Sequence, residues 1–281
     1  MKVKELMTRD PVCVTLPNSR NAVIKSMVEH SLTGVPVLRA KDNHYVGVIT
    51  RQHIFRKPTV DQLALLVDSN YPTLTPDQSV ITAAKEMVEK NIHHIPVLKD
   101  GTVKGIVTAA DLLKVISLSK DKRPVSHFIK TVCVPVHTST PITIASEVVR
   151  LANVYAMPVL NNEGKLAGIV TDRDLFNLSQ VKDSMKTSDL GLGDDENTWS
   201  WEGMRNVMTL YYEISKIHLP DIPVKEVMVA NPMTVFAQTS ISEAARTMVD
   251  NDFGQLPVTN VNDQLVGMLY ELDAITALIG D

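Results

Sequence analysis

Apolar and polar residues alternate along this chain in an order that recurs four times. Each cycle opens with a short apolar segment at strand spacing, as at residues 132–136 and 233–236. A stretch with helical spacing follows, which in one copy carries Val80, Ala84 and Met87. Two further apolar segments joined by a polar turn, and then a second helical stretch, complete the cycle. The pattern therefore predicts four β-α-β-β-α units.

Two landmarks inside the units support a true repeat. Four segments read VPVL, IPVL, MPVL and LPVT, and each is followed after a polar turn by YVGVIT, VKGIVT, LAGIVT or LVGMLY. The glycines of the second set keep nearly the same separations as the prolines of the first, which is typical of structural repeats. We place the repeats at residues 1–59, 60–119, 120–179 and 223–281, with an insertion at 180–222.

The insertion lengthens the third interval between landmarks and contains both tryptophans of the chain. Between residues 200 and 217, the side chains of Trp201, Met204, Met208 and Tyr211 fall near one helical face. This spacing predicts an extra helix packed on the fourth repeat. A lid, or a helix that docks a partner, is the alternative interpretation.

A single unit of this kind cannot cover both faces of its own small sheet. Units must therefore pack in pairs, and four units give two pairs. The fold class we expect is α/β (α+β). Polar residues stand where N-caps belong before the first helix of three repeats, namely Asn18 or Ser19, Asp77 and Ser240.

The end of the third strand of each unit carries a candidate binding motif. Two copies are intact and read Gly-x-x-Thr-x-x-Asp, with Thr108 and Asp111 in repeat 2 and Thr171 and Asp174 in repeat 3. At a strand-to-helix junction this pair resembles a capping box, which only starts a helix. The same geometry also suits a nucleotide, because helix N-termini favour phosphate and a carboxylate accepts hydrogen bonds from ribose hydroxyls.

The other two copies of the motif are damaged. Repeat 1 keeps Thr50 but has His53 in place of the acid, and an imidazole cannot accept from two ribose hydroxyls as a carboxylate does. Repeat 4 keeps Asp273 but has the bulkier Tyr270 in place of Thr, which either stacks on a base or fills the cleft. We expect two good sites, one marginal site and one dead site.

These repeated motifs resemble the CBS-domain family over nearly the whole chain apart from the insertion. Paired CBS repeats form a Bateman module, and four in one chain resemble the γ subunit of AMP-activated protein kinase and its archaeal relatives. The resemblance implies a disk of two modules whose clefts bind AMP, ADP, ATP or S-adenosylmethionine-like ligands. It also implies that the acid holds ribose and that Thr lies near phosphate, which nominates Thr108 with Asp111 and Thr171 with Asp174.

The resemblance adds three cationic or ionisable candidates. His93 matches a histidine that contacts phosphate in the kinase subunit, and His94 stands where that protein has an arginine. Arg173 precedes Asp174 and could reach a phosphate in the cleft of repeat 3. The alternatives are an ordinary turn feature for the histidines and a solvated helix position for the arginine.

Composition narrows the classes of function. The formal net charge of −4 and the absence of a long basic cluster argue against nucleic-acid binding. No signal peptide or apolar stretch of membrane-spanning length is evident, so we expect a cytoplasmic protein without a membrane partner. Two cysteines and scattered histidines give no metal-ligand spacing, and we expect no metal and no cofactor.

Three classes of function compete, namely a ligand sensor, a scaffold and an enzyme. An adenine-nucleotide sensor that regulates a separate protein is favoured. A scaffold with vestigial sites, or a sensor of an S-adenosylmethionine-type ligand, is the alternative. An enzyme is disfavoured because no nucleophile elbow, Walker loop or metal motif is present. Scarce basic clamps favour AMP or ADP over ATP, and four repeats allow a monomeric disk or a homodimer.

Overall fold

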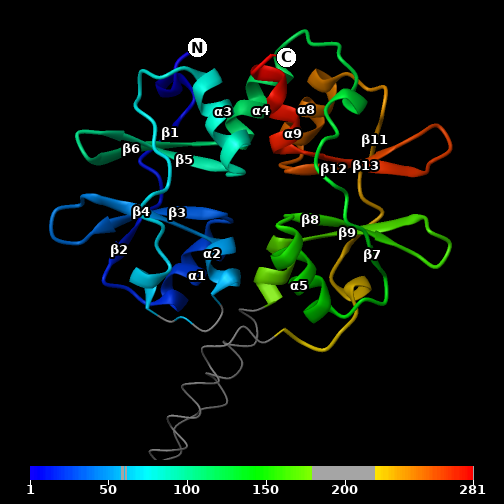
Figure 1. The fold of residues 1–281 in the computed structure, drawn as a ribbon, viewed down its shortest axis with the longest axis horizontal. Coiled ribbons are helices and arrows are strands. Elements are labelled where there is room, and N and C mark those ends of the chain that lie inside the picture. The colour runs from blue at the N-terminus through cyan, green and yellow to red at the C-terminus, as the bar shows by residue number, and fades with distance from the viewer. Residues whose placement is uncertain (58–59, 61, 179–218, 281) are drawn as a thin grey trace, which may run out of the picture.

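The computed structural model describes residues 1–57, 60, 62–178 and 219–280, and Figure 1 shows its four repeats around a common centre. Repeats 1 and 2 form a first module, and repeats 3 and 4 form a second module beside it. The strands lie in a middle band, and helices gather above and below this band in the view of Figure 1. The helix predicted between residues 200 and 217 lies outside the described residues. None of the helices in the described ranges is both long and apolar enough to cross a membrane.

The first module follows the predicted order of elements. Repeat 1 comprises β2 (Val14–Leu16), α1 (Arg20–Glu29), β3 (Gly34–Arg39), β4 (Tyr45–Thr50) and α2 (Arg51–Arg56). Repeat 2 comprises α3 (Val80–Lys90), β5 (His94–Lys99), β6 (Thr102–Thr108) and α4 (Ala109–Ser117). Its first strand is reduced to a single bridge between Leu74 and Val97.

The second module repeats this order. Repeat 3 comprises β7 (Val136–His137), α5 (Ile142–Ala152), β8 (Ala156–Leu160), β9 (Leu166–Thr171) and a helix over residues 172–178. Repeat 4 comprises β11 (Val235–Phe236), α8 (Ile241–Asp250), β12 (Gln255–Thr259), β13 (Leu265–Tyr270) and α9 (Glu271–Ile275). The mixed α/β class and the four repeats predicted from the sequence are confirmed.

The first strands of repeats 3 and 4 are shorter than the sequence suggested. The apolar segments predicted at 132–136 and 233–236 contribute strand only at β7 and β11. Asp10 and Asn231, just upstream of the first strands of repeats 1 and 4, have positive φ and turn the chain. The residues before these turns therefore leave the sheet of their own repeat and can pack against another repeat.

Most of the expected helix caps are present. The Ser19 and Ser240 side chains accept hydrogen bonds from the N–H groups of Ala22 and Glu243. The prediction for Asp77 is wrong, because Ser79 caps α3. Asp77 instead forms exposed ion pairs with Lys2 and Lys4 of the N-terminal segment.

The residues before the first strand of each repeat, called its leading segment, pack against the other repeat of the same module. The two repeats of a module thus exchange their leading segments. The strand β1 (Thr8–Arg9), in the leading segment of repeat 1, pairs with β6 of repeat 2, and β10 (Val229–Ala230), in the leading segment of repeat 4, pairs with β9 of repeat 3. Four short 3₁₀ helices complete the exchange: η1 (Val3–Glu5), η2 (Leu63–Leu65), η3 (Val125–His127) and η4 (Val224–Glu226). Each places one fully buried residue in the core of the partner repeat.

The two modules share two hydrophobic cores. One core combines repeats 2 and 4, where α4 packs against α8 and α9. The other combines repeats 1 and 3, where α2 packs against α5. Each helical layer in Figure 1 therefore comes from both modules, which fixes one module against the other.

A buried ion pair crosses the interface between repeats 1 and 3. Arg51 Nη1 lies 3.6 Å from Asp172 Oδ1, and the two side chains are 5% and 8% exposed. Burial lowers the pKa of Arg51 and raises the pKa of Asp172, so each charge depends on the other. Arg51 and Asp172 stand at equivalent positions of their repeats. Each is the first residue of the helix that follows the third strand.

Removing one partner of this pair should destabilise the protein strongly. We expect Asp172→Asn to lower the free energy of unfolding by about 3 kcal/mol or more, because the Arg51 charge stays buried without compensation. The double variant Arg51→Met with Asp172→Leu should recover most of that loss. Urea unfolding of both variants tests this, and a stable Asp172→Asn protein would contradict it.

Candidate functional site

The exchange of leading segments places the motif of one repeat beside the leading segment of its partner, and the space between the two is called a cleft. The antiparallel pairing of Arg9 with Gly105 and of Ala230 with Gly168 fixes two of these walls. Each cleft is named here by the repeat that supplies its motif. The motif residues are Thr50 and His53 in cleft 1, Thr108 and Asp111 in cleft 2, Thr171 and Asp174 in cleft 3, and Tyr270 and Asp273 in cleft 4.

Both intact motifs form the expected cap. The Thr108 N–H donates to Asp111 Oδ2 at 3.0 Å, and the Asp111 N–H donates to Thr108 Oγ1 at 3.3 Å. In cleft 3 the Thr171 N–H donates to Asp174 Oδ2 at 2.8 Å, and the Asp174 N–H donates to Thr171 Oγ1 at 3.4 Å. The cap occupies only one carboxylate oxygen of each acid, so capping does not exclude a ligand on the other oxygen.

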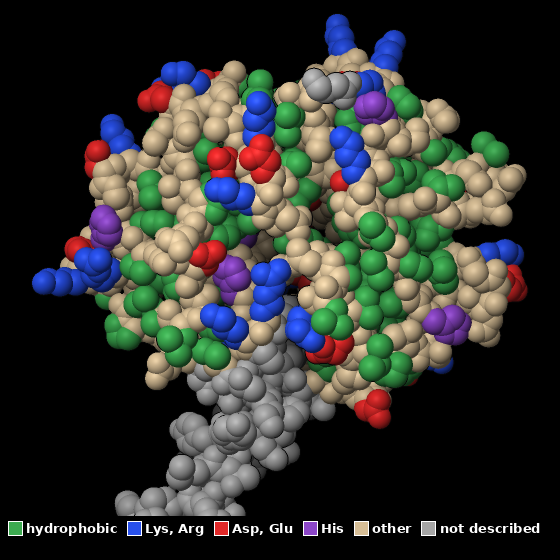
Figure 2. All heavy atoms as spheres, in the orientation of Figure 1, with side chains coloured by type: hydrophobic (Ala, Val, Ile, Leu, Met, Phe, Trp, Pro, Cys, Tyr) green, Lys and Arg blue, Asp and Glu red, His purple; other side chains and the backbone are tan. Residues whose placement is uncertain are grey.

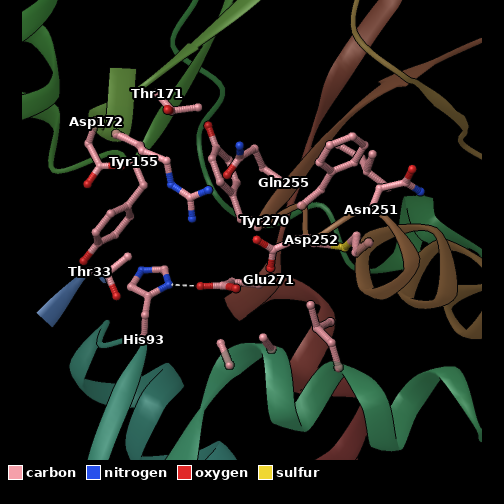
Figure 3. A pocket seen from close by; sticks show the side chains of 18 of the residues that line it. Thr33, His93, Tyr155, Thr171, Asp172, Asn251, Asp252, Gln255, Tyr270 and Glu271 are labelled. Atoms are coloured by element: carbon pink, nitrogen blue, oxygen red, sulfur yellow. Dashed lines mark hydrogen bonds and ion pairs between the residues drawn. The ribbon is translucent and has the colours of Figure 1, made fainter. Parts of the chain in front are cut away.

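One cavity of about 950 Å³ lies where the four repeats meet. Figure 2 shows that the viewed face is hollowed near its centre. Thr108 of cleft 2 and both Thr171 and Asp174 of cleft 3 line this cavity, so the threonine of each intact motif borders the same space. Ten of the lining side chains are labelled in Figure 3.

The cavity that Thr171 and Asp174 border also has an apolar lining. Val229, Met233 and Phe253 line the cavity and are 54%, 48% and 36% exposed. Val229 and Met233 belong to the leading segment of repeat 4, and Phe253 follows α8. Large apolar side chains left open beside a carboxylate are suited to a ligand with one flat apolar part and one polar part.

Cleft 1 is filled by side chains of the protein itself. Tyr71, from the leading segment of repeat 2, stacks on His94 with ring centroids 5.6 Å apart and meets His53 edge-on at 6.4 Å. Its hydroxyl donates to the His94 carbonyl at 3.1 Å. Thr50 caps α2 by accepting from the His53 N–H at 3.1 Å. The buried Tyr71 ring therefore occupies the space that a ligand would need.

Cleft 4 is closed in a different way. The Tyr270 side chain is buried and its hydroxyl donates to the Ala156 carbonyl at 2.9 Å. The Asp273 carboxylate accepts from Thr131 Oγ1 at 2.9 Å and from the Thr131 N–H at 3.3 Å. The Tyr270 side chain thus packs between repeats 3 and 4 and also lines the central cavity, and the choice between stacking on a base and filling the cleft stays a prediction.

The remaining candidates lie at or near the centre. His93 Nδ1 contacts Glu271 Oε1 across the interface between repeats 2 and 4, and the His93 ring meets Tyr155 edge-on at 4.0 Å (Figure 3). Arg173 is exposed and lines the cavity, whereas His94 is almost wholly buried at its edge. Within the described part of the chain, no group of three or more His, Cys, Asp or Glu side chains is arranged to hold a metal ion.

Several residues that shape the site were not found from the sequence. Met233 and Phe253 supply the apolar wall, Glu271 holds His93, and Tyr71 closes cleft 1. The position of Tyr71 gave a signal in the sequence. Tyr71 stands just before Pro72 in the leading segment of repeat 2, and the corresponding segment of repeat 4 carries Pro232 and Met233.

The buried imidazole of His94 makes stability depend on pH. Burial, helped by neighbouring imidazoles and Arg51, lowers the pKa of His94 to about 3. In the unfolded chain a histidine titrates near 6.5, so between these values only the unfolded chain takes up the proton. The stability contribution is thus complete above pH 6.5 and is lost as the pH falls towards 3.

We therefore expect this one group to lower the free energy of unfolding by about 2 kcal/mol between pH 7 and pH 5. Urea unfolding at both pH values measures the change. His94→Gln should remove that part of the pH dependence, whereas the exposed control His30→Gln should keep it. An unchanged pH dependence in His94→Gln would contradict the assignment.

Comparisons with known proteins agree with this architecture. Protein MJ1225 of Methanocaldococcus jannaschii is 23% identical over 277 residues, which cover 90% of this chain and 89% of that protein. Its crystal structure, described as that of a candidate archaeal homologue of γ-AMPK, matches with a TM-score of 0.78 at 19% identity and covers 99% of this chain and 100% of that chain. A conserved protein of Pyrococcus horikoshii matches with a TM-score of 0.66 at 24% identity, covering 99% and 100%. At these identities the structural matches show the fold alone.

A second relative is matched only in part. Protein MJ1404 of Methanocaldococcus jannaschii is 28% identical over 206 residues, which are 72% of this chain but 40% of that protein. The sequence profile of the CBS domain matches residues 3–59, 62–118, 125–180 and 224–280, which together make up most of the chain. The protein therefore belongs to the CBS domain family and carries four copies of that domain.

Proposed function

We propose that this protein is a regulatory sensor that binds an adenine nucleotide and acts on a separate protein. The observation that carries the proposal is cleft 3, where Thr171 and Asp174 face the same cavity as Met233 and Phe253. An adenosine has a flat base and a ribose diol, and the cleft offers an apolar wall for the first and a carboxylate for the second. The CBS domain family, to which the chain belongs, supports a ligand of this kind.

The charged side chains that line the cavity indicate how many phosphates a bound nucleotide would carry. Its permanent cations are Arg51, Lys114 and Arg173, and its carboxylates are Asp172, Asp174, Asp252 and Glu271. Arg51 already pairs with Asp172, and Lys114 already pairs with Asp111. Arg173, next to the motif, has no carboxylate partner among the described residues. A cavity with this balance favours AMP or ADP over ATP, because a triphosphate needs several uncommitted cations.

An adenosine with an amino-acid tail, such as S-adenosylmethionine, is a second candidate. Arg173 and Asp252 line the same cavity and have no ion-pair partner among the described residues. A guanidinium and a carboxylate on one cavity suit the carboxylate and the ammonium of a zwitterionic tail. A ligand panel that includes AMP, ADP, ATP and S-adenosylmethionine separates these candidates.

Regulation follows from where the cavity lies. Residues of all four repeats line it, so a ligand in cleft 3 would lie in a cavity that both modules border. A ligand biases an arrangement only if it binds one arrangement more tightly than another, so the proposal requires that the ligand bind one packing of the two modules more tightly. The proposed output is a change in module packing that a separate partner chain reads.

The ribose contact can be separated from the helix cap by one substitution. Asp174→Asn keeps a carbonyl oxygen for the Thr171 N–H but replaces the second carboxylate oxygen with an amide donor. We expect AMP binding to weaken at least about tenfold, because a hydrogen bond to a charged group is lost. Isothermal titration calorimetry measures the affinity, and the melting temperature reports the fold.

A matched control comes from Glu243→Gln, which changes the same helical position in the Ser240 cap of α8. Glu243 is not among the residues that line the cavity, so this variant should bind like the wild type. A loss of melting temperature in Asp174→Asn without a change in affinity would favour the pure capping role. No heat from any ligand of the panel would favour the scaffold hypothesis.

A further inference from the structure

The two open clefts differ in the charged side chains around the acid, and one of these differences is Lys114. In cleft 2, Lys114 Nζ lies 3.0 Å from Asp111 Oδ1, which is the carboxylate oxygen that takes no part in the helix cap. Asp111 Oδ2 accepts from both the N–H and the hydroxyl of Thr108. Both oxygens of Asp111 are thus engaged by the protein. The Asp111 side chain is 7% exposed, whereas that of Lys114 is 57% exposed.

Cleft 3 lacks this competitor. The residue three positions after Asp174 is Asn177, which is exposed and carries no charge. Asp174 Oδ2 accepts from the N–H and the hydroxyl of Thr171, and Oδ1 has no partner among the described residues. Asp174 lines the central cavity, whereas Asp111 does not. The acid is thus exposed to the cavity only where the lysine is absent.

We propose that Lys114 acts as a built-in competitor for the ribose diol and sets the order in which the two open clefts fill. The proposal rests on the nucleoside binding put forward above. A ligand enters cleft 3 directly, but in cleft 2 its hydroxyls must first displace the ammonium group from Asp111 Oδ1. Lys114 is therefore a specificity-determining residue, and the chain has one tighter and one weaker nucleoside site.

The size of the effect follows from the exposure of the lysine. An ion pair with one solvated partner is worth little, so its displacement should weaken binding only about fivefold. A fivefold ratio between the two affinities is enough for the two clefts to fill over different ranges of ligand concentration. Lys114 also lines the cavity, so its ammonium group, once displaced, stays near the centre.

Reciprocal exchange of the two residues tests the proposal. Lys114→Asn gives cleft 2 the residue of cleft 3, and Asn177→Lys does the reverse. In the Asp174→Asn background, where cleft 2 is the one open cleft that keeps its acid, Lys114→Asn should tighten the binding of adenosine about fivefold. In the wild-type background, Asn177→Lys should weaken the tighter site by a similar factor. Calorimetry with adenosine is suitable because this probe has no phosphate that could attract the lysine.

The outcomes separate this inference from the proposed function. If the wild type binds adenosine but Lys114→Asn leaves the affinity of cleft 2 unchanged or weakens it, the competitor role is overturned while nucleoside binding stands. If none of the proteins binds adenosine, AMP or S-adenosylmethionine, both proposals are overturned. Lys114→Gln serves as a second uncharged variant, and thermal unfolding shows whether each variant is folded.

Discussion

The structure depends on one constraint, which is that a CBS repeat cannot bury its small sheet and its helices alone. Each repeat lends its leading segment to its partner, so that Val3, Leu63, Val125 and Val224 become core residues of repeats other than their own. The helices then pack across the module interface, with α4 against α8 and α9. The apolar surface buried by these exchanges holds four similar units in one arrangement.

The same exchange determines which clefts are open. Because the leading segment of one repeat runs beside the motif of its partner, the side chain just before the first strand faces the space where a ligand would bind. Pro232 and Met233 at that place leave cleft 3 open, whereas Tyr71 fills cleft 1. In cleft 4 the closing ring comes from the motif itself, at Tyr270. Packing and ligand access are therefore set by the same few residues.

Much of this could be predicted from the sequence, because the repeat and its motif are local patterns. The Thr–Asp pairs at 108–111 and 171–174 form the caps that their spacing indicated. The closure of cleft 1 could not be predicted in the same way, since Tyr71 and His53 are brought together by the pairing of two repeats. The competition of Lys114 for Asp111 was also missed, because a lysine on an exposed helical turn is usually solvated.

The central claim is that a nucleoside binds where the cavity meets an intact motif and an open apolar wall. A crystal structure of the protein grown with AMP tests it most directly. The account predicts a nucleoside in cleft 3, with its ribose on Asp174 and its base against Met233 and Phe253, and none in clefts 1 and 4. A nucleoside bound beside Tyr71 or Tyr270, with cleft 3 empty, would contradict it.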